Sequence, residues 1–263
     1  MEHLFSSWEN VKKRLNGACV FLFLDFDGTL SPIVSTPDKA VIPLEVRALL
    51  KEISLKKDYK VAIISGRSLS DIKKRVGVEG IIYSGNHGLE VESPKINHKP
   101  QISSEYLQGL KKIKSELKER LKGIKGAFIE DKGISLAVHF RQARKKETDL
   151  IKTIFREVVI IPSVVKKIKI RTGKKVIEAG PPLEWDKGKM VLWLISRQMF
   201  CLDGNKEVVA IYLGDDVTDE DAFKALKKDG ITILVGTKRA SLANYHLNSP
   251  KEVYKFLSFI RDL

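Results

Sequence analysis

Acidic residues follow two apolar runs of the sequence at the points where the runs end. Asp25 and Asp27 follow the first run, Asp215 and Asp216 follow the second, and Asp219 lies one helical turn further on. Carboxylates that lie close together repel one another unless a hard cation sits between them or one of them is protonated. The pattern therefore predicts a Mg²⁺ site whose carboxylate residues are Asp25, Asp27, Asp215 and Asp216. The alternative is a polar turn after a core strand.

A hydroxyl and an ammonium complete a set of groups that could hold a phosphoryl group. Ser65 follows another apolar run, and Lys187 lies at the start of a helical pattern. A metal ion, an ammonium and a hydroxyl can together bind the oxygens of a phosphoryl group. Asp25 is then the candidate nucleophile, which forms an aspartyl-phosphate, and Asp27 the candidate general acid and base. Taken singly, Ser65 could instead cap a helix, and Lys187 could be a solvated lysine.

The elements that would position these groups are strands that alternate with helices. Continuous apolar runs predict buried strands, and they lie at residues 19–24, 61–64, 81–83, 208–213 and 231–235. Between them, apolar residues recur at helical spacing, as at residues 44–50 and 69–76. This alternation predicts an α/β fold with a parallel sheet covered on both faces. Ligands of such sheets bind at the carboxyl ends of the strands, where the polar residues lie.

The pattern changes in the middle of the chain. Residues 134–140 alternate between apolar and polar, which is typical of a strand with one open face. Residues 164–170 and 175–178 predict a hairpin joined at residues 171–174. We therefore predict an inserted α+β domain at residues 93–180. Residues 1–92 and 181–263 form the parallel core.

The composition is that of a folded protein with a basic surface. Of 263 residues, 43% are hydrophobic and 30% charged, and 47 Lys+Arg stand against 33 Asp+Glu. A basic surface attracts anions, including nucleic acids and phosphorylated small molecules. Because the lysines are scattered along helices without interleaved aromatic residues, we expect a solvated surface and no specific nucleic-acid partner. Nucleic-acid binding driven by charge is the rival hypothesis.

Cysteine usage and the absence of an apolar segment bear on location. Cys19 and Cys201 show neither the spacing of a zinc site nor a disulfide framework, so we expect both to be reduced. No segment has the pattern of a signal peptide or a membrane span. We therefore expect a cytoplasmic protein without a membrane partner. Separately, we expect a monomer.

The motifs resemble those of a known superfamily. The segments DFDGTL at 25–30, SGR at 65–67, Lys187 and GDDVTD at 214–219 look like the four motifs of haloacid-dehalogenase-superfamily phosphatases. More narrowly, GNHGLE at 85–90, EDKG at 130–133 and HFR at 139–141 resemble trehalose-6-phosphate phosphatases. The resemblance runs from about Phe21 to Val235, which is most of the chain.

This resemblance implies a Rossmann-like core with a mobile cap that recognises the sugar. It implies Mg²⁺-dependent hydrolysis of trehalose 6-phosphate, so the partner is a small-molecule sugar phosphate. By position, the sugar would be bound by one set of residues from the cap, Glu130, Lys132, Arg141, Lys174 and Glu178, and by one set from the core, Asn86 and His87. Charged groups suit a polyhydroxylated ligand because they form several strong hydrogen bonds.

This chain departs from the family pattern at one position. The family commonly has Arg-Pro soon after the glutamate that matches Glu178, whereas this chain has AGPP at residues 179–182. The missing arginine therefore concerns a substrate contact or the hinge geometry. The alternatives are a phosphatase for another sugar phosphate, such as sucrose phosphate or mannosyl-3-phosphoglycerate, and a sugar-phosphate sensor without turnover.

Overall fold

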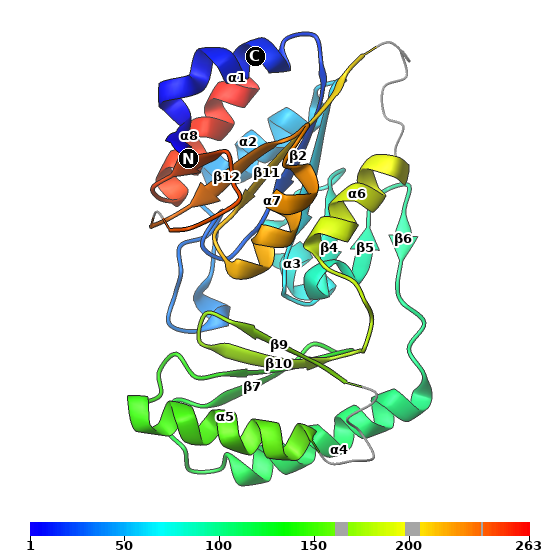
Figure 1. The fold of residues 1–263 in the computed structure, drawn as a ribbon. Helices are drawn as coiled ribbons and strands as arrows, with labels where there is room; N and C mark the ends of the chain where they lie inside the picture. Colours follow the sequence, from blue (N-terminus) through cyan, green and yellow to red (C-terminus); the bar gives the residue numbers. More distant parts are fainter. Residues whose placement is uncertain (161–167, 198–205, 238) are drawn as a thin grey trace. The chain divides into compact units, whose positions relative to one another are not determined.

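The protein consists of two compact units in the computed structural model, which describes residues 1–160, 168–197, 206–237 and 239–263 (Figure 1). One unit is formed by Met1–Lys99 and Trp185–Leu263, and the other by Pro100–Glu184. The predicted insertion begins at residue 93, whereas residues 97–98 still pair within the sheet of the first unit. Each unit has its own sheet and its own apolar core.

The first unit is built on a nine-stranded, mainly parallel sheet. Its strands are β1 (Glu2–His3), β2 (Cys19–Leu24), β3 (Tyr59–Ile64), β4 (Ile82–Gly85), β5 (Glu90–Glu92), β6 (Asn97–His98), β11 (Val208–Gly214), β12 (Ile231–Val235) and β13 (Tyr245–Leu247). Their order is β1-β13-β12-β11-β2-β3-β4-β5-β6. All pairs up to β4 are parallel, and β5 and β6 join in antiparallel pairs. The five predicted strands are β2, β3, β4, β11 and β12, so the α/β prediction is confirmed.

Helices cover both faces of this sheet, as the continuous apolar strands require. In β2, Leu22 points into one apolar cluster and Phe23 into the other. The first cluster also contains side chains of four helices, α1 (Trp8–Leu15), α2 (Leu44–Leu55), α3 (Leu69–Val76) and α8 (Pro250–Arg261). The second contains side chains of α6 (Lys187–Arg197) and α7 (Glu220–Leu226) (Figure 1). The first unit is therefore a three-layer α/β structure.

The direction of the chain through the sheet changes between β2 and β11. From β2 the chain continues outward through β3 to β4, whereas β12 and β13 lie on the other side of β11. The paired residues Leu24 and Leu213 bring the carboxyl ends of β2 and β11 side by side. Such a switch point is where parallel α/β sheets bind their ligands. Asp25 and Asp215 follow these two strand ends directly.

The second unit packs two helices against one face of an antiparallel sheet. Its elements are α4 (Ser104–Arg120), β7 (Phe128–Asp131), β8 (Leu136–His139), α5 (Lys145–Val159), β9 (Lys169–Gly173) and β10 (Val176–Gly180). The strand order is β7-β8-β10-β9. Val138 and Ile177 join the apolar cluster of the helices. On the opposite face, the register places Glu130, Ala137, Glu178 and Arg171 in one row across the sheet.

The hairpin of this unit differs from the prediction. The predicted turn at residues 171–174 is wrong, because Arg171 lies within β9 and pairs with Glu178. The chain turns at residues 174–175, where Lys175 adopts a φ of 66°. Part of the predicted strand, residues 164–167, lies outside the described residues. The turn residues are two lysines and not Gly or Asn, the residue types that usually mark a turn. The sequence therefore predicted the turn too early in the chain.

The state of the cysteines also differs from the prediction. Cys19 is disulfide-bonded, so the expectation of a reduced side chain is wrong there, and the expectation for Cys201 lies outside the described residues. Cysteine spacing alone does not show whether a particular cysteine is oxidised, which is why the sequence did not indicate it. Within the described part of the chain, no helix is long and apolar enough to cross a membrane.

Candidate active site

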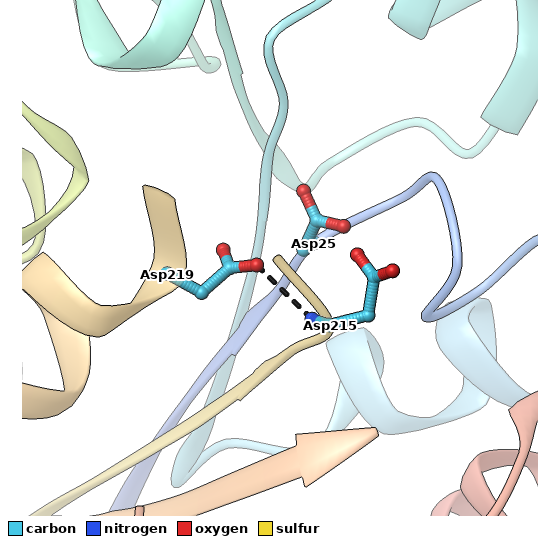
Figure 2. Close-up of side chains that lie close together, drawn as sticks. All are labelled: Asp25, Asp215 and Asp219. Atoms are coloured by element: carbon cyan, nitrogen blue, oxygen red, sulfur yellow. Dashed lines mark hydrogen bonds between the residues drawn. The ribbon is translucent and has the colours of Figure 1, made fainter. Parts of the chain in front are cut away.

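Three carboxylates meet at the switch point of the first unit (Figure 2). Asp25 follows β2, Asp215 follows β11, and Asp219 ends the short 3₁₀ helix Val217–Asp219. One oxygen from each lies within 4.8 Å of the others. All three residues are buried. The backbone N–H of Asp25 donates to the carbonyl of Leu213 at 3.0 Å, which fixes the start of the loop after β2.

Two glycines allow the chain to approach these carboxylates closely. A Cβ on Gly28 would lie 2.2 Å from Oδ2 of Asp215, and Gly28 also has a φ of 91°. A Cβ on Gly214 would lie 2.2 Å from Cγ of Asp219. Any other residue would therefore displace one of the acidic side chains. The glycines of both sequence motifs are explained by this packing.

Lys187 brings the only ammonium group that contacts this cluster among the described residues. Its Nζ donates to Oδ1 of Asp25 and to Oδ1 of Asp219, each at 2.7 Å. The side chain is only 3% exposed. Burial lowers the pKa of Lys187, but the carboxylates of Asp219 and Asp25 outweigh burial and hold that pKa well above its ordinary value. Lys187 is therefore a charged lysine of the site, which excludes the solvated alternative.

Asp219 is saturated with hydrogen bonds. Oδ1 accepts from Nζ of Lys187 at 2.7 Å and from the hydroxyl of Tyr212 at 2.8 Å. Oδ2 accepts from the backbone N–H groups of Asp215 at 3.0 Å and Asp216 at 2.9 Å. Four donors use all the favourable positions of one carboxylate. Asp219 therefore serves as an anchor that orients Lys187 and the loop after β11.

The donor set suits a divalent cation. Three buried carboxylates against one ammonium leave a formal charge of −2, since −3 and +1 add to −2. Burial raises the pKa of Asp25 well above its ordinary value, while Lys187 lowers it and Asp219 and Asp215 raise it. An added cation would favour the ionised form of Asp25. A buried cluster of carboxylate oxygens can therefore bind a hard metal ion.

Asp27 turns toward a buried arginine and is not one of the clustered carboxylates. Nε and Nη2 of Arg67 donate to the two oxygens of Asp27, both at 2.7 Å. Arg67 also donates to Oδ2 of Asp71 at 2.7 Å and to the carbonyl of Pro37 at 2.9 Å. The side chain of Asp27 is still 45% exposed. Arg67 therefore controls the direction in which Asp27 points.

Ser65 lies buried at the carboxyl end of β3. Its Oγ accepts from the backbone N–H of Arg67 at 3.2 Å. The alternative that Ser65 caps a helix does not hold, since α3 begins at Leu69 and its cap is Ser68, which accepts from the N–H of Asp71 at 3.3 Å. The hydroxyl predicted to bind a phosphoryl oxygen thus lies at the same sheet edge as Asp25.

Asn86 and His87 form a strained corner after β4. Both adopt left-handed backbone conformations, with φ of 50° and 58°, which are costly for residues with side chains. Nδ2 of Asn86 donates to Oε2 of Glu90 at 2.5 Å. A Cβ on Gly66 would lie 2.6 Å from Cε1 of His87, so the imidazole packs against the glycine that follows Ser65. The two residues lie next to Ser65, and their predicted role with the sugar stays a prediction.

The carboxylate of Asp216 lies outside the cluster of three, and its predicted role as a metal residue stays a prediction. Its backbone N–H donates to Asp219, but its carboxylate is not among the three that cluster. Of the four predicted metal residues, the structure brings together Asp25 and Asp215. The third carboxylate of the cluster comes from Asp219, whose predicted place was one turn beyond the site.

The predicted cap residues lie on or near the polar face of the second unit's sheet. Lys132 pairs with Glu178 across the sheet, and both side chains are buried. Nε2 of His139 contacts Oε2 of Glu130 at 2.7 Å. Two predicted residues, Arg141 and Lys174, are exposed and lie beyond the strand ends, where Nη2 of Arg141 donates to the carbonyl of Lys174 at 2.9 Å. The face thus combines carboxylates with cationic side chains.

Sequence reasoning missed three residues that the structure brings into these sites. Arg67 pairs with Asp27 across 40 positions, and Tyr212 is hidden within an apolar run. Arg171 was assigned to a turn. Of these three, only Arg67 stood in a quoted motif, SGR at residues 65–67, and no role was predicted for it.

The fold and the site together define a class of protein. A parallel α/β sheet with carboxylates after two neighbouring strands, a buried lysine and an inserted α+β unit is the arrangement of haloacid-dehalogenase-like phosphatases. Within that class, the family model described as trehalose-phosphatase matches residues 23–251. The chain therefore belongs to the trehalose-phosphatase family, whose members are phosphatases.

Relatives of known name agree with this assignment. Trehalose-phosphate phosphatase B of Arabidopsis thaliana is 35% identical over 262 residues, which cover 95% of this chain and 68% of that protein. A trehalose-phosphate phosphatase of Mycobacterium ulcerans is 36% identical over 242 residues, covering 89% of this chain and 60% of the relative. The likeness extends through both units.

Solved structures support the fold. The C-terminal domain of trehalose-6-phosphate phosphatase from C. albicans has a TM-score of 0.83 at 21% identity, covering 100% of this chain and 99% of that one. The C-terminal domain of the Candida albicans trehalose synthase regulatory protein has a TM-score of 0.73 at 14% identity, with 96% and 97% covered. Because the same fold occurs in a regulatory protein, function must be argued from the site.

Proposed function

We propose that this chain is a Mg²⁺-dependent phosphatase that hydrolyses trehalose 6-phosphate to trehalose and inorganic phosphate. The observation that carries the proposal is the buried contact between Lys187 and Asp25 beside Asp215, in a chain of the trehalose-phosphatase family. The names of the relatives support the substrate. The alternatives, another sugar phosphate or a sensor without turnover, are separated by the experiment below.

The reaction proceeds in two steps on Asp25. Lys187 holds Oδ1 of Asp25, so we assign Oδ2 as the oxygen that attacks phosphorus. The bond between phosphorus and the sugar oxygen breaks, and that oxygen takes a proton from Asp27. Water then attacks the phosphorus of the aspartyl-phosphate and gives a proton to Asp27, which releases phosphate and restores Asp25. Splitting the hydrolysis in this way replaces one difficult step by two easier ones.

Other residues of the core bind and orient the phosphoryl group. Lys187 and Ser65 supply an ammonium and a hydroxyl for its oxygens. Asp25 and Asp215 would hold Mg²⁺, with Asp219 fixing the loop that carries Asp215. When bound, Mg²⁺ neutralises charge between the nucleophile and the phosphate, which would otherwise repel. Both oxygens of Asp27 accept hydrogen bonds from Arg67, so this arginine orients the proposed general acid and base.

The second unit is the proposed sugar-recognition domain. Its boundaries were predicted at residues 93–180, and the compact unit spans Pro100–Glu184. Glu130, Lys132 and Glu178 lie on its polar face. Hydroxyl groups both donate and accept hydrogen bonds, so a face that carries both charges suits a disaccharide. The roles of Arg141, Lys174, Asn86 and His87 with the sugar belong to the same proposal.

A cytoplasmic monomer without a nucleic-acid partner remains the proposal for location and assembly. The disulfide at Cys19 bears on location, because disulfides are uncommon in reducing cytosols except in hyperthermophiles. A surface rich in lysine and glutamate fits such a heat-adapted source.

Phosphate release from a panel of substrates tests the proposal. The panel contains trehalose 6-phosphate, glucose 6-phosphate, sucrose 6-phosphate and mannosyl-3-phosphoglycerate, each with Mg²⁺ and with EDTA. We expect release from trehalose 6-phosphate that EDTA abolishes and that Asp25→Asn lowers at least about 1,000-fold, because the nucleophile is lost. Preference for another sugar phosphate would refute the substrate and leave the chemistry of the core intact. No turnover of any substrate would favour a sensor.

A further inference from the structure

Gly180 ends β10 without a side chain, and an arginine from the neighbouring strand occupies the space beside it. A Cβ on Gly180 would lie 2.8 Å from Nη1 of Arg171, 3.6 Å from Cβ of Ser135 and 4.0 Å from Oε1 of Glu178. The conformation of Gly180 is ordinary, so backbone strain does not demand glycine here. The Arg171 guanidinium therefore occupies the space that a side chain at position 180 would take, and such a side chain would have to displace it.

Arg171 belongs to the polar row of the sheet. It lies directly opposite Glu178, and the same row contains Glu130. Directly opposed residues of antiparallel strands share one face and lie close enough to interact. Lys132 contacts Oε2 of Glu178, and both Nη1 of Arg171 and Oε1 of Glu178 lie within 4 Å of the position that a Cβ on Gly180 would take.

Tyr106 lies near the same charged residues. Its hydroxyl donates to the carbonyl of Ile134 at 2.9 Å. Burial raises the pKa of Tyr106, with Glu178 raising it further and Arg171 lowering it. A phenol senses both charges only if both lie near it. Arg171 and Glu178 are therefore both close enough to Tyr106 to affect its ionisation, in agreement with their pairing in the sheet.

We propose that Arg171 is a specificity-determining residue that binds the sugar, and that Gly180 makes room for its guanidinium. The proposal rests on the proposed function, because it assumes a polyhydroxylated substrate on this face. A planar guanidinium gives directed hydrogen bonds to hydroxyl and ring oxygens. The glycine at 180 then has a physical meaning, since an arginine reaches the same space from the adjacent strand.

The test compares a sugar phosphate with a substrate that has no sugar. Arg171→Ala should lower kcat/KM for trehalose 6-phosphate roughly 10- to 100-fold, mainly through KM, the range expected for hydrogen bonds to a charged group. Hydrolysis of p-nitrophenyl phosphate, which has no sugar, should not change. Lys169→Ala is the matched control, because Lys169 is a cation of the same strand opposite Gly180 and pairs with Glu184 at 3.3 Å. It should leave both substrates unaffected.

Two further variants test whether side chains at positions 171 and 180 compete for the same space. Gly180→Arg alone should impair sugar-phosphate hydrolysis, because its side chain would collide with Arg171. Adding Arg171→Ala to Gly180→Arg should recover most of the activity by presenting a guanidinium from the other strand. Arg171→Lys keeps the charge near Glu178 but loses the planar fork, so a loss of sugar selectivity in this variant separates recognition from folding.

The outcomes separate this inference from the proposed function. If the wild type prefers another sugar phosphate, the same variants are compared on that substrate; if it turns over none, they are compared by calorimetric binding of trehalose. Loss specific to the sugar in Arg171→Ala, with recovery in the double variant, supports the role of Arg171. Three outcomes would each overturn it. Arg171→Ala could lower the hydrolysis of both substrates equally, or it could leave both the kinetics and the binding of trehalose unchanged. The double variant could also be no more active than Arg171→Ala.

Discussion

Asp219 is the residue on which the geometry of the acidic cluster depends. Its carboxylate accepts from Lys187, from Tyr212 and from two backbone N–H groups. An amide in its place could not accept all four donors and would leave Lys187 with less negative charge around it. Asp219→Asn should lower kcat at least about 100-fold by disturbing a preorganised site. It should also lower the free energy of unfolding by about 3 kcal/mol, as expected when a buried pair loses one partner.

Asp216→Asn is the matched control for this prediction. Asp216 is a carboxylate of the same loop, but its side chain lies outside the cluster, so this variant should keep most of the activity and stability. Urea unfolding and phosphate release measure both quantities. If Asp216→Asn proved the more harmful of the two, the original prediction of Asp216 as a metal residue would be right and the anchor role of Asp219 wrong.

The sequence predicted the position of a site residue well where that residue follows the end of a strand. Asp25, Ser65 and Asp215 follow apolar runs directly, so the sheet fixes their positions. The direction of Asp27 could not be predicted, because it is set by Arg67, which is 40 positions away. Pairings of this kind depend on tertiary contacts that no local pattern encodes.

At the scale of elements, the site depends on how closely the loops after β2 and β11 approach each other. Gly28 has a φ of 91°, and its Cβ would lie 2.2 Å from Asp215. Gly28→Ala should therefore abolish most phosphatase activity by displacing Asp215, in addition to the backbone cost of about 1–2 kcal/mol.

Gly80→Ala separates the two contributions. Gly80 has a φ of 82°, and a Cβ there would meet nothing within 4 Å. This variant should show the backbone cost alone, with full activity in the folded protein. Thermal unfolding and phosphate release give both readouts. Equal activities of Gly28→Ala and Gly80→Ala would show that the close approach to Asp215 is unimportant.

The long strands were predicted from the sequence and the short ones were not, because a short strand shows too little of a pattern. The five buried strands contain continuous apolar runs and were all predicted. The outer strands of the sheet, β1 and β13 on one side and β5 and β6 on the other, have two or three residues each, too few to show a periodicity. The β9–β10 turn was misplaced because Lys174 and Lys175 carry no turn signal, and with it the strand position of Arg171 was lost.

At the scale of the whole molecule, the apolar residues form separate cores. Two clusters lie in the first unit and one in the second, and no residue of these clusters is shared between the units. Units with separate cores can unfold in separate transitions. Because all the residues of the acidic cluster lie in the first unit, a bound metal should stabilise that unit selectively.

Calorimetry with Mg²⁺ and with EDTA tests this expectation. A ligand that binds only the folded state stabilises it by about 2.7 kcal/mol at 100 times its dissociation constant. We expect Mg²⁺ to raise the midpoint temperature of one unfolding transition and to leave that of the other unchanged. Hydrogen exchange should become slower at β2 and β11 but not at β8 and β10. Asp215→Asn, which removes a carboxylate of the cluster, should abolish the shift. A single transition that moves as a whole would mean that the two units are energetically coupled, and a shift that survives Asp215→Asn would place the metal elsewhere.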